Sequence, residues 1–151
     1  MRNILFTFCV FSLLLFSCDD EETINPDGFK ENTVRIDGSW QLNNVTQNNI
    51  DITDRFDFQS TNLVFSYSDE GTPTAFELIS SNGTPLPIFA ESGSWAFNDL
   101  TYPTELSFTG SNGTTTLLLT GLPLQTGGSD LEFEVDYGCG DNTYVYSFKK
   151  N

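Results

Sequence analysis

The 151-residue chain contains no histidine, three cysteines, and six basic residues against 21 acidic ones. Without histidine it lacks the base of Ser-His-Asp and Cys-His catalytic sites and the commonest protein ligand of zinc. The formal charge of -15, with Lys149-Lys150 as the only basic cluster, predicts no binding to nucleic acid, which requires a basic patch. We therefore expect a protein that is not an enzyme and has no cofactor and no metal site.

Long apolar runs are also absent after the N-terminus. Residues 4–16 are apolar except for Thr7 and Ser12, and Arg2 precedes them. A membrane-spanning helix needs about 20 apolar residues, so this run is typical of a secretory signal peptide instead. The mature chain would therefore have no segment that spans a membrane.

A cysteine ends the apolar run. Leu15, Ser17 and Cys18 have the spacing of a bacterial lipoprotein signal, which predicts cleavage before Cys18 and attachment of acyl chains such as palmitate to this residue. Two or three acyl chains would anchor the protein durably to a membrane, whereas one chain binds only marginally. The alternative is ordinary secretion with Cys18 unmodified.

Four carboxylates, residues 19–22, follow Cys18 directly. This run resembles the export signal of surface lipoproteins of the Bacteroidetes type. The resemblance implies a lipid-anchored protein of the outer membrane, exposed at the cell surface. A periplasm-facing position is the alternative, and a solvated acidic tether is compatible with both.

The mature chain would keep two cysteines, Cys18 and Cys139, because Cys9 leaves with the signal peptide. With Cys18 lipidated, no intrachain disulfide is possible, so an apolar core must hold the fold. We expect a signal peptide over 1–17, the lipidated cysteine and an acidic tether over 18–36, and one domain over 37–151. A flexible tether of this length would reach about 25 Å.

The domain shows alternation with period two and no sustained helical periodicity. In the clearest strand, Leu131, Phe133 and Val135 alternate with Glu132 and Glu134, as in an antiparallel strand with one solvated face. Eight strands are predicted, approximately at residues 39–46, 62–68, 74–80, 92–98, 104–109, 114–121, 130–137 and 143–149.

Short polar turns separate these strands. Asn112-Gly113 predicts a type I′ hairpin, and residues 47–61 form the one long insertion, predicted to be a packed flap or a short extra strand. Eight short antiparallel strands with tight turns favour an all-β, up-and-down barrel, because closure removes exposed sheet edges. An open β-sandwich is the alternative.

Gly38-Ser39-Trp40 opens the first strand and resembles the lipocalin signature. The resemblance implies that Trp40 closes one end of the barrel under a basic residue from near the C-terminus, here Lys149 or Lys150. Lipocalins use arginine there and carry a C-terminal helix, and this chain has neither feature. It looks closer to the short, uncharacterised, lipocalin-like lipoproteins of Bacteroidetes.

Aromatic side chains dominate the positions predicted to face inward. An eight-stranded barrel is filled by such side chains or holds one small ligand, with tyrosine hydroxyls as polar contacts. The candidate ligand-binding residues are Phe65, Tyr67, Phe76, Trp95, Phe133, Tyr137, Tyr144 and Tyr146.

An enzyme is the least favoured of three hypotheses, because it would need buried aspartate or glutamate residues that face each other in a cleft. Two other functions agree with these features. One is a membrane-anchored binding module for a small hydrophobic molecule or a glycan. The other is a non-catalytic protein with a filled barrel that interacts with an outer-membrane protein, as an accessory subunit of a complex or an inhibitor. A cavity inside the barrel would distinguish them.

Overall fold

The structure, a computed structural model, describes residues 33–81, 83–121, 130–138 and 142–151. The predicted signal peptide, Cys18 and most of the predicted tether lie outside the described residues, as does Cys139. No helix in the described ranges is long and apolar enough to cross a membrane.

The described domain is built from antiparallel strands, as predicted. Each of the eight predicted strands is present with its ends displaced by at most one residue, and one two-residue strand, β2, is added. The strands are β1 (Gly38–Gln47), β2 (Ile50–Asp51), β3 (Asn62–Tyr67), β4 (Pro73–Ile79), β5 (Ser92–Phe97), β6 (Glu105–Gly110), β7 (Gly113–Gly121), β8 (Asp130–Asp136) and β9 (Thr143–Lys150).

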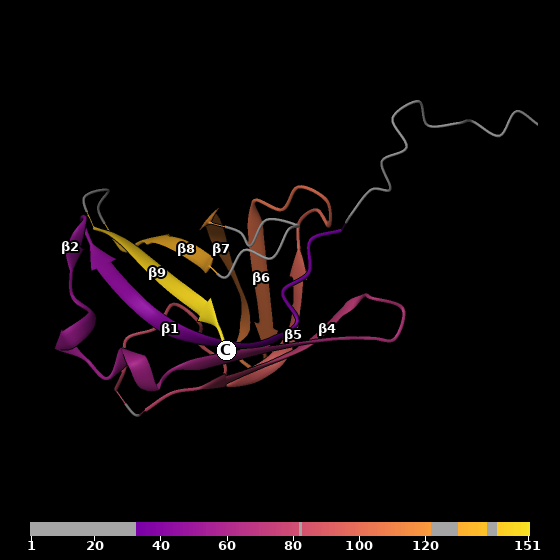
Figure 1. Ribbon diagram of the computed structural model, residues 1–151, viewed down its shortest axis with the longest axis horizontal. Helices are drawn as coiled ribbons and strands as arrows, with labels where there is room; N and C mark the ends of the chain where they lie inside the picture. Colours follow the sequence, from indigo (N-terminus) through magenta and orange to yellow (C-terminus); the bar gives the residue numbers. More distant parts are fainter. Residues whose placement is uncertain (1–32, 82, 122–129, 139–141) are drawn as a thin grey trace, which may run out of the picture. The chain divides into compact units, whose positions relative to one another are not determined.

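The sheet closes into a barrel because its first and last long strands pair. β3 to β9 follow β1 in chain order, and β1 also pairs with β9 from Trp40↔Lys150 to Gln47↔Tyr144. Figure 1 shows β1 and β9 side by side although they lie at opposite ends of the domain sequence. This closure confirms the up-and-down barrel and excludes the open sandwich.

Aromatic rings fill the middle of the barrel. The Phe108 ring centroid on β6 lies 6.1 Å from that of Phe65 on β3, 4.9 Å from that of Phe76 on β4 and 6.1 Å from that of Phe133 on β8. None of these three strands is a neighbour of β6 in the sheet. These four rings pack on one another across the barrel and form the centre of its core.

The insertion between β1 and β3 combines the two predicted alternatives. It contains β2 and two short 3-10 helices, η1 (Thr53–Arg55) and η2 (Phe58–Ser60), and it buries Ile52 and Phe58. The insertion packs on the second half of β1, beyond the end of its pairing with β3. The Val45 N–H there donates to Thr53 Oγ1 at 2.9 Å.

One predicted turn type is wrong. The β6–β7 hairpin turns through Ser111 and Asn112, and only Gly113, at a φ of 117°, has positive φ. A type I′ turn requires positive φ at both central residues. That requirement is met instead between β1 and β2, where Asn48 and Asn49 have φ of 50° and 63°. Asparagine tolerates this left-handed region better than other non-glycine residues.

Candidate functional site

The two ends of the barrel are built differently. The closed end carries residues 33–37, the β3–β4 turn, the β5–β6 loop and the C-terminus of β9. The open end carries the β1–β2 turn and insertion (48–61), the β4–β5 loop (described over 80–81 and 83–91), the β6–β7 hairpin and the start of β9. The predicted site residues divide between these ends and the filled middle.

Trp40 seals the closed end. Its side chain is buried, and its Nε1–H donates to the Ile36 carbonyl at 2.8 Å. Lys150 Nζ lies 5.7 Å from the centroid of the Trp40 ring. The basic residue over Trp40 is thus Lys150 and not Lys149. Lys150 is paired directly with Trp40 and shares its face of the sheet, whereas Lys149 is paired with Gln41 on the other face.

Tyr67 and Trp95 also belong to the closed end. Tyr67 Oη accepts a hydrogen bond from the Ile36 N–H at 3.1 Å, and the Arg35 guanidinium lies 4.7 Å from the centroid of the Tyr67 ring. Trp95 packs edge-on against Tyr67, at 5.1 Å between centroids, and its Nε1–H donates to the Ser66 carbonyl at 3.2 Å. Burial raises the pKa of Tyr67, so its hydroxyl stays protonated at neutral pH.

Three further candidate residues, Phe65, Phe76 and Phe133, lie in the filled middle. All three are buried, and each packs on Phe108. Their rings serve as core contacts in this structure and are not brought to a shared cavity.

The open end holds a cavity of about 560 Å³. This volume lies within the roughly 300–1,000 Å³ range of small-molecule sites. Three of the candidate tyrosines, from the β8–β9 hairpin, line it together with residues of the insertion and of the β4–β5 loop. The lining residues are Gln47, Ile52, Arg55, Phe56, Phe58, Pro85, Leu86, Tyr137, Tyr144 and Tyr146.

The three tyrosines form one wall of this cavity. The Tyr144 ring lies 5.3 Å from that of Tyr137, edge to face, and 6.5 Å from that of Tyr146, stacked. Tyr146 is buried, and its Oη donates to the Pro85 carbonyl across the open end at 3.3 Å. Burial raises the pKa of both Tyr137 and Tyr146, so these hydroxyls are protonated hydrogen-bond donors at neutral pH.

Sequence reasoning missed the part of the lining that the insertion supplies, where the Phe58 ring packs edge-on against Tyr146 at 6.3 Å between centroids. Ile52, Phe56 and Phe58 come from the insertion, which was expected to pack on the domain but not to line a site. Arg55 and Gln47 supply its polar groups. The sequence feature that could have indicated this part of the lining is the insertion itself. A loop with three large apolar residues is expected to pack on another apolar surface or to form a binding site.

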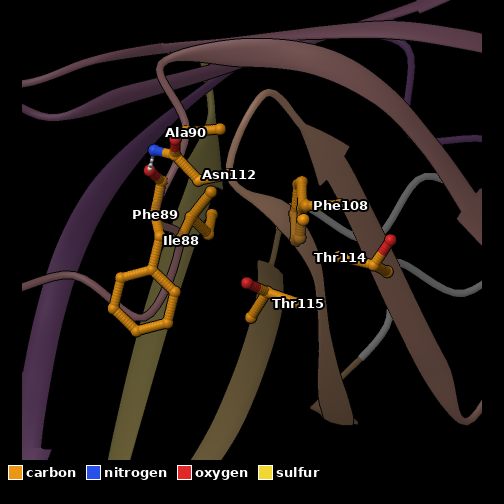
Figure 2. A pocket seen from close by; sticks show the side chains of 8 residues that line it. Ile88, Phe89, Ala90, Phe108, Asn112, Thr114 and Thr115 are labelled. Carbon is orange, nitrogen blue, oxygen red and sulfur yellow. Dashed lines mark hydrogen bonds between the residues drawn. The ribbon is translucent and has the colours of Figure 1, made fainter.

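A smaller cavity of about 220 Å³ lies between the later residues of the β4–β5 loop and the β6–β7 hairpin. Ile88, Phe89 and Ala90 line it from the loop, facing Phe108 and Thr115. Figure 2 shows the Asn112 side chain hydrogen-bonded to the Phe89 carbonyl, and the Nδ2–O distance is 3.2 Å. The β4–β5 loop therefore contributes residues to two cavities, and hydrogen bonds to Tyr146 and Asn112 hold it next to each of them.

The described residues were compared with the side-chain arrangements that bind metal ions. Within residues 33–81, 83–121, 130–138 and 142–151, no group of three or more cysteine, aspartate or glutamate side chains is arranged to hold a metal ion.

Comparison with known proteins gives one result. A family model described as "Domain of unknown function (DUF5004)" matches residues 18–149. No curated protein and no solved structure matches the chain.

Proposed function

Because the chain belongs to the DUF5004 family, whose description assigns no function, we propose a function from its own geometry. The protein is a non-catalytic binding module that holds one small, mainly apolar molecule in the open-end cavity. The observation that carries this proposal is the cavity of about 560 Å³ with its wall of three tyrosines.

The lining favours an apolar ligand over a glycan. Ile52, Phe58, Pro85 and Leu86 offer no side-chain hydrogen bonds to the hydroxyl groups of a sugar, and burying such groups unpaired is unfavourable. Phe56 is 47% exposed, and a ligand that covered it would remove apolar surface from water. An oligosaccharide is the alternative ligand that the experiment below must test.

The absence of histidine supports a non-catalytic role. No carboxylate lines the cavity among its described residues, and the protonated tyrosines are weak bases. The site therefore offers hydrogen-bond donors and ring faces but no general base.

We also propose that Cys18 carries the lipid anchor in the outer membrane, with the domain at the cell surface. In support, the matched family region begins at Cys18, and residues 33–37 join the barrel at its closed end. The tether would therefore be attached at the end opposite the cavity, and the cavity would stay accessible. A periplasm-facing domain is the alternative.

One observation favours a second candidate function, binding of an outer-membrane protein. Ile50, Phe56, Phe89 and Tyr137 are large apolar side chains exposed around the open end. Such residues occur at protein interfaces as well as at ligand sites.

Titration with N-phenyl-1-naphthylamine, a neutral fluorescent probe, tests the binding function. The mature chain without its lipid, residues 19–151, avoids competition from detergent micelles. We expect saturable binding of one probe molecule, weakened about tenfold by Tyr144→Ala through loss of ring contact. Tyr102→Ala, at an 80% exposed tyrosine of the closed end, is the matched control and should have no effect.

Absence of saturable binding would refute the proposed function. If oligosaccharides displaced the probe and apolar molecules did not, the ligand would be a glycan and not an apolar molecule. A one-to-one complex with an outer-membrane protein that Phe89→Ser abolishes, together with no probe binding, would establish the second candidate.

Proteinase treatment of intact cells tests the location. We expect the wild-type protein to be degraded, and a Cys18→Ala variant to lose its membrane attachment or to keep its signal peptide. A protein that is protected on intact cells but degraded after lysis of the outer membrane would contradict surface exposure.

A further inference from the structure

The charges around the cavity point to the kind of ligand. Among the lining residues that the structure describes, Arg55 carries the only charge. The other basic residues of the described domain, Arg35, Lys149 and Lys150, lie at the closed end or in the last residues of β9 that lead to it. In a chain with a formal charge of -15, the one described cation of the open end stands beside the cavity.

Among the described residues, no carboxylate lies within ion-pair distance of the Arg55 guanidinium. Asp54 and Asp57 are close in sequence, but the ion pair of the described residues joins Arg35 and Asp37 at the other end. The Asp51 carboxylate accepts hydrogen bonds from the Thr53 hydroxyl and N–H at 2.7 and 2.9 Å. The backbone of Arg55 is fixed by donation of its N–H to the Ile52 carbonyl at 2.9 Å.

The other polar groups of the cavity also suit an anion. Burial keeps the Tyr137 hydroxyl protonated, and Gln47 has an amide that can donate. A cationic ligand group would meet Arg55 and no carboxylate among the described lining residues. An oxyanion would meet a guanidinium, whose fork of N–H donors matches carboxylate and sulfonate oxygens.

We propose that the ligand of the open-end cavity is an amphipathic anion, an apolar body that bears one carboxylate, sulfonate or phosphate group. This inference rests on the proposed function and adds the charge of the ligand to it. Arg55 pairs with the anionic group at the mouth, and the apolar body contacts Phe56, Phe58 and Tyr144. Because the domain as a whole repels anions, this single cation decides whether such a ligand binds.

Two fluorescent probes that share the same apolar body, N-phenylnaphthylamine, and differ in charge test the proposal. 8-Anilinonaphthalene-1-sulfonate carries a sulfonate, and N-phenyl-1-naphthylamine does not. We expect the wild-type domain to bind the sulfonate more tightly, and Arg55→Gln to weaken sulfonate binding about tenfold with less than about a twofold change for the neutral probe. Arg35→Gln, the matched removal of a cation at the closed end, should change neither affinity.

The possible results separate this inference from the proposed function. Binding of both probes with equal affinity, unchanged by Arg55→Gln, would overturn the anion inference and leave the binding function standing. An equal loss for both probes in Arg55→Gln would also overturn it, since the side chain would then act by packing. Failure of both probes to bind the wild-type domain would refute the binding function itself. Partial retention of sulfonate binding by Arg55→Lys would support the charge pairing.

Discussion

The two ends of this barrel use aromatic residues for opposite purposes. At the closed end, Trp40 and Tyr67 each hydrogen-bond to Ile36, and the chain entering the barrel covers their rings. At the open end, Tyr137 and Tyr144 have no such cover, and beside them lies a cavity of about 560 Å³. Aromatic side chains therefore close one end of the barrel and line a cavity at the other.

The difference comes from the backbone that reaches each end. Residues 33–37 place Val34 and Ile36 as buried side chains over the closed end, and the Val34 N–H donates to the Leu100 carbonyl at 2.7 Å. The β4–β5 loop spans the open end. The Tyr146 hydroxyl donates a long hydrogen bond of 3.3 Å to the Pro85 carbonyl of this loop. A second hydrogen bond, from Asn112 to the Phe89 carbonyl at 3.2 Å, holds the later part of this loop, and the cavity of about 560 Å³ lies beside its Pro85 and Leu86.

We expect the largest loss of stability from a substitution that removes Trp40 from the closed end. Trp40→Ala removes a buried ring and its hydrogen bond to Ile36, so we expect a loss of about 3–5 kcal/mol in the free energy of unfolding. Urea denaturation followed by far-UV circular dichroism measures it. At the open end, Tyr144→Ala should cost less, because this half-buried ring borders a cavity. Equal losses would contradict the division between a sealed and an open end.

A matched pair of threonines tests how the insertion is held. Thr53→Val leaves the Val45 N–H without its 2.9 Å acceptor, so we expect a loss of about 1–3 kcal/mol. Thr61 Oγ1 is buried and has no hydrogen-bond partner among the described residues, so Thr61→Val should be neutral or stabilising. Denaturation of both variants gives the comparison, and a larger loss for Thr61→Val would contradict it.

A third comparison removes one hydrogen-bond donor from each end and keeps an aromatic side chain at both positions. Tyr146→Phe loses the 3.3 Å bond to Pro85, and we expect it to cost about 0.5 kcal/mol, the low end for a hydrogen bond. Trp40→Phe loses a 2.8 Å bond and ring volume, and should cost more. Amide hydrogen exchange should accelerate in the β4–β5 loop of Tyr146→Phe and nowhere at the closed end. Unchanged exchange in that loop would show that Tyr146 does not hold it.

The smallest expected effect concerns pH. Hydrogen bonds from the Thr53 hydroxyl and N–H hold the pKa of Asp51 below its ordinary value of 3.8, and the N–H groups of Tyr102 and Thr101 do the same for Asp99 at the closed end. Since both folded pKa values are lowered, their stabilisation is present above pH about 3.8 and is lost as the pH falls through the folded values. In Thr53→Val, carboxyl NMR titration should show the pKa of Asp51 rise toward its ordinary value. That of Asp99 should not move.

Most strands could be predicted from sequence because their residues alternate between two faces, although β7, with Leu117, Leu118 and Leu119 in a row, is apolar on both. Leu131 and Phe133 are buried, as the alternation with Glu132 and Glu134 indicated. The β6–β7 turn could not be assigned in the same way, because a turn type depends on which two residues occupy its centre. Asn112 and Gly113 suit more than one register, and strand pairing decided it.

The site was harder to predict than the fold, for a physical reason. Alternation shows that Phe65 and Tyr146 both point inward, but it does not show how far along the barrel axis other rings reach them. Phe65 meets Phe108 from across the barrel, whereas Tyr146 lies near the mouth beside the cavity. Arg55 had no periodic signal, because it lies in a 3-10 helix of the insertion.

The chain's five tyrosines allow a direct test of the central claim that the open end binds the ligand. Tyr137, Tyr144 and Tyr146 line the open-end cavity, whereas Tyr67 and Tyr102 belong to the closed end. In ring-labelled NMR spectra of the domain, saturation with N-phenyl-1-naphthylamine should shift the resonances of the first three tyrosines and leave the other two in place. Shifts confined to Tyr67 and Tyr102, or no shifts at saturation, would contradict the account.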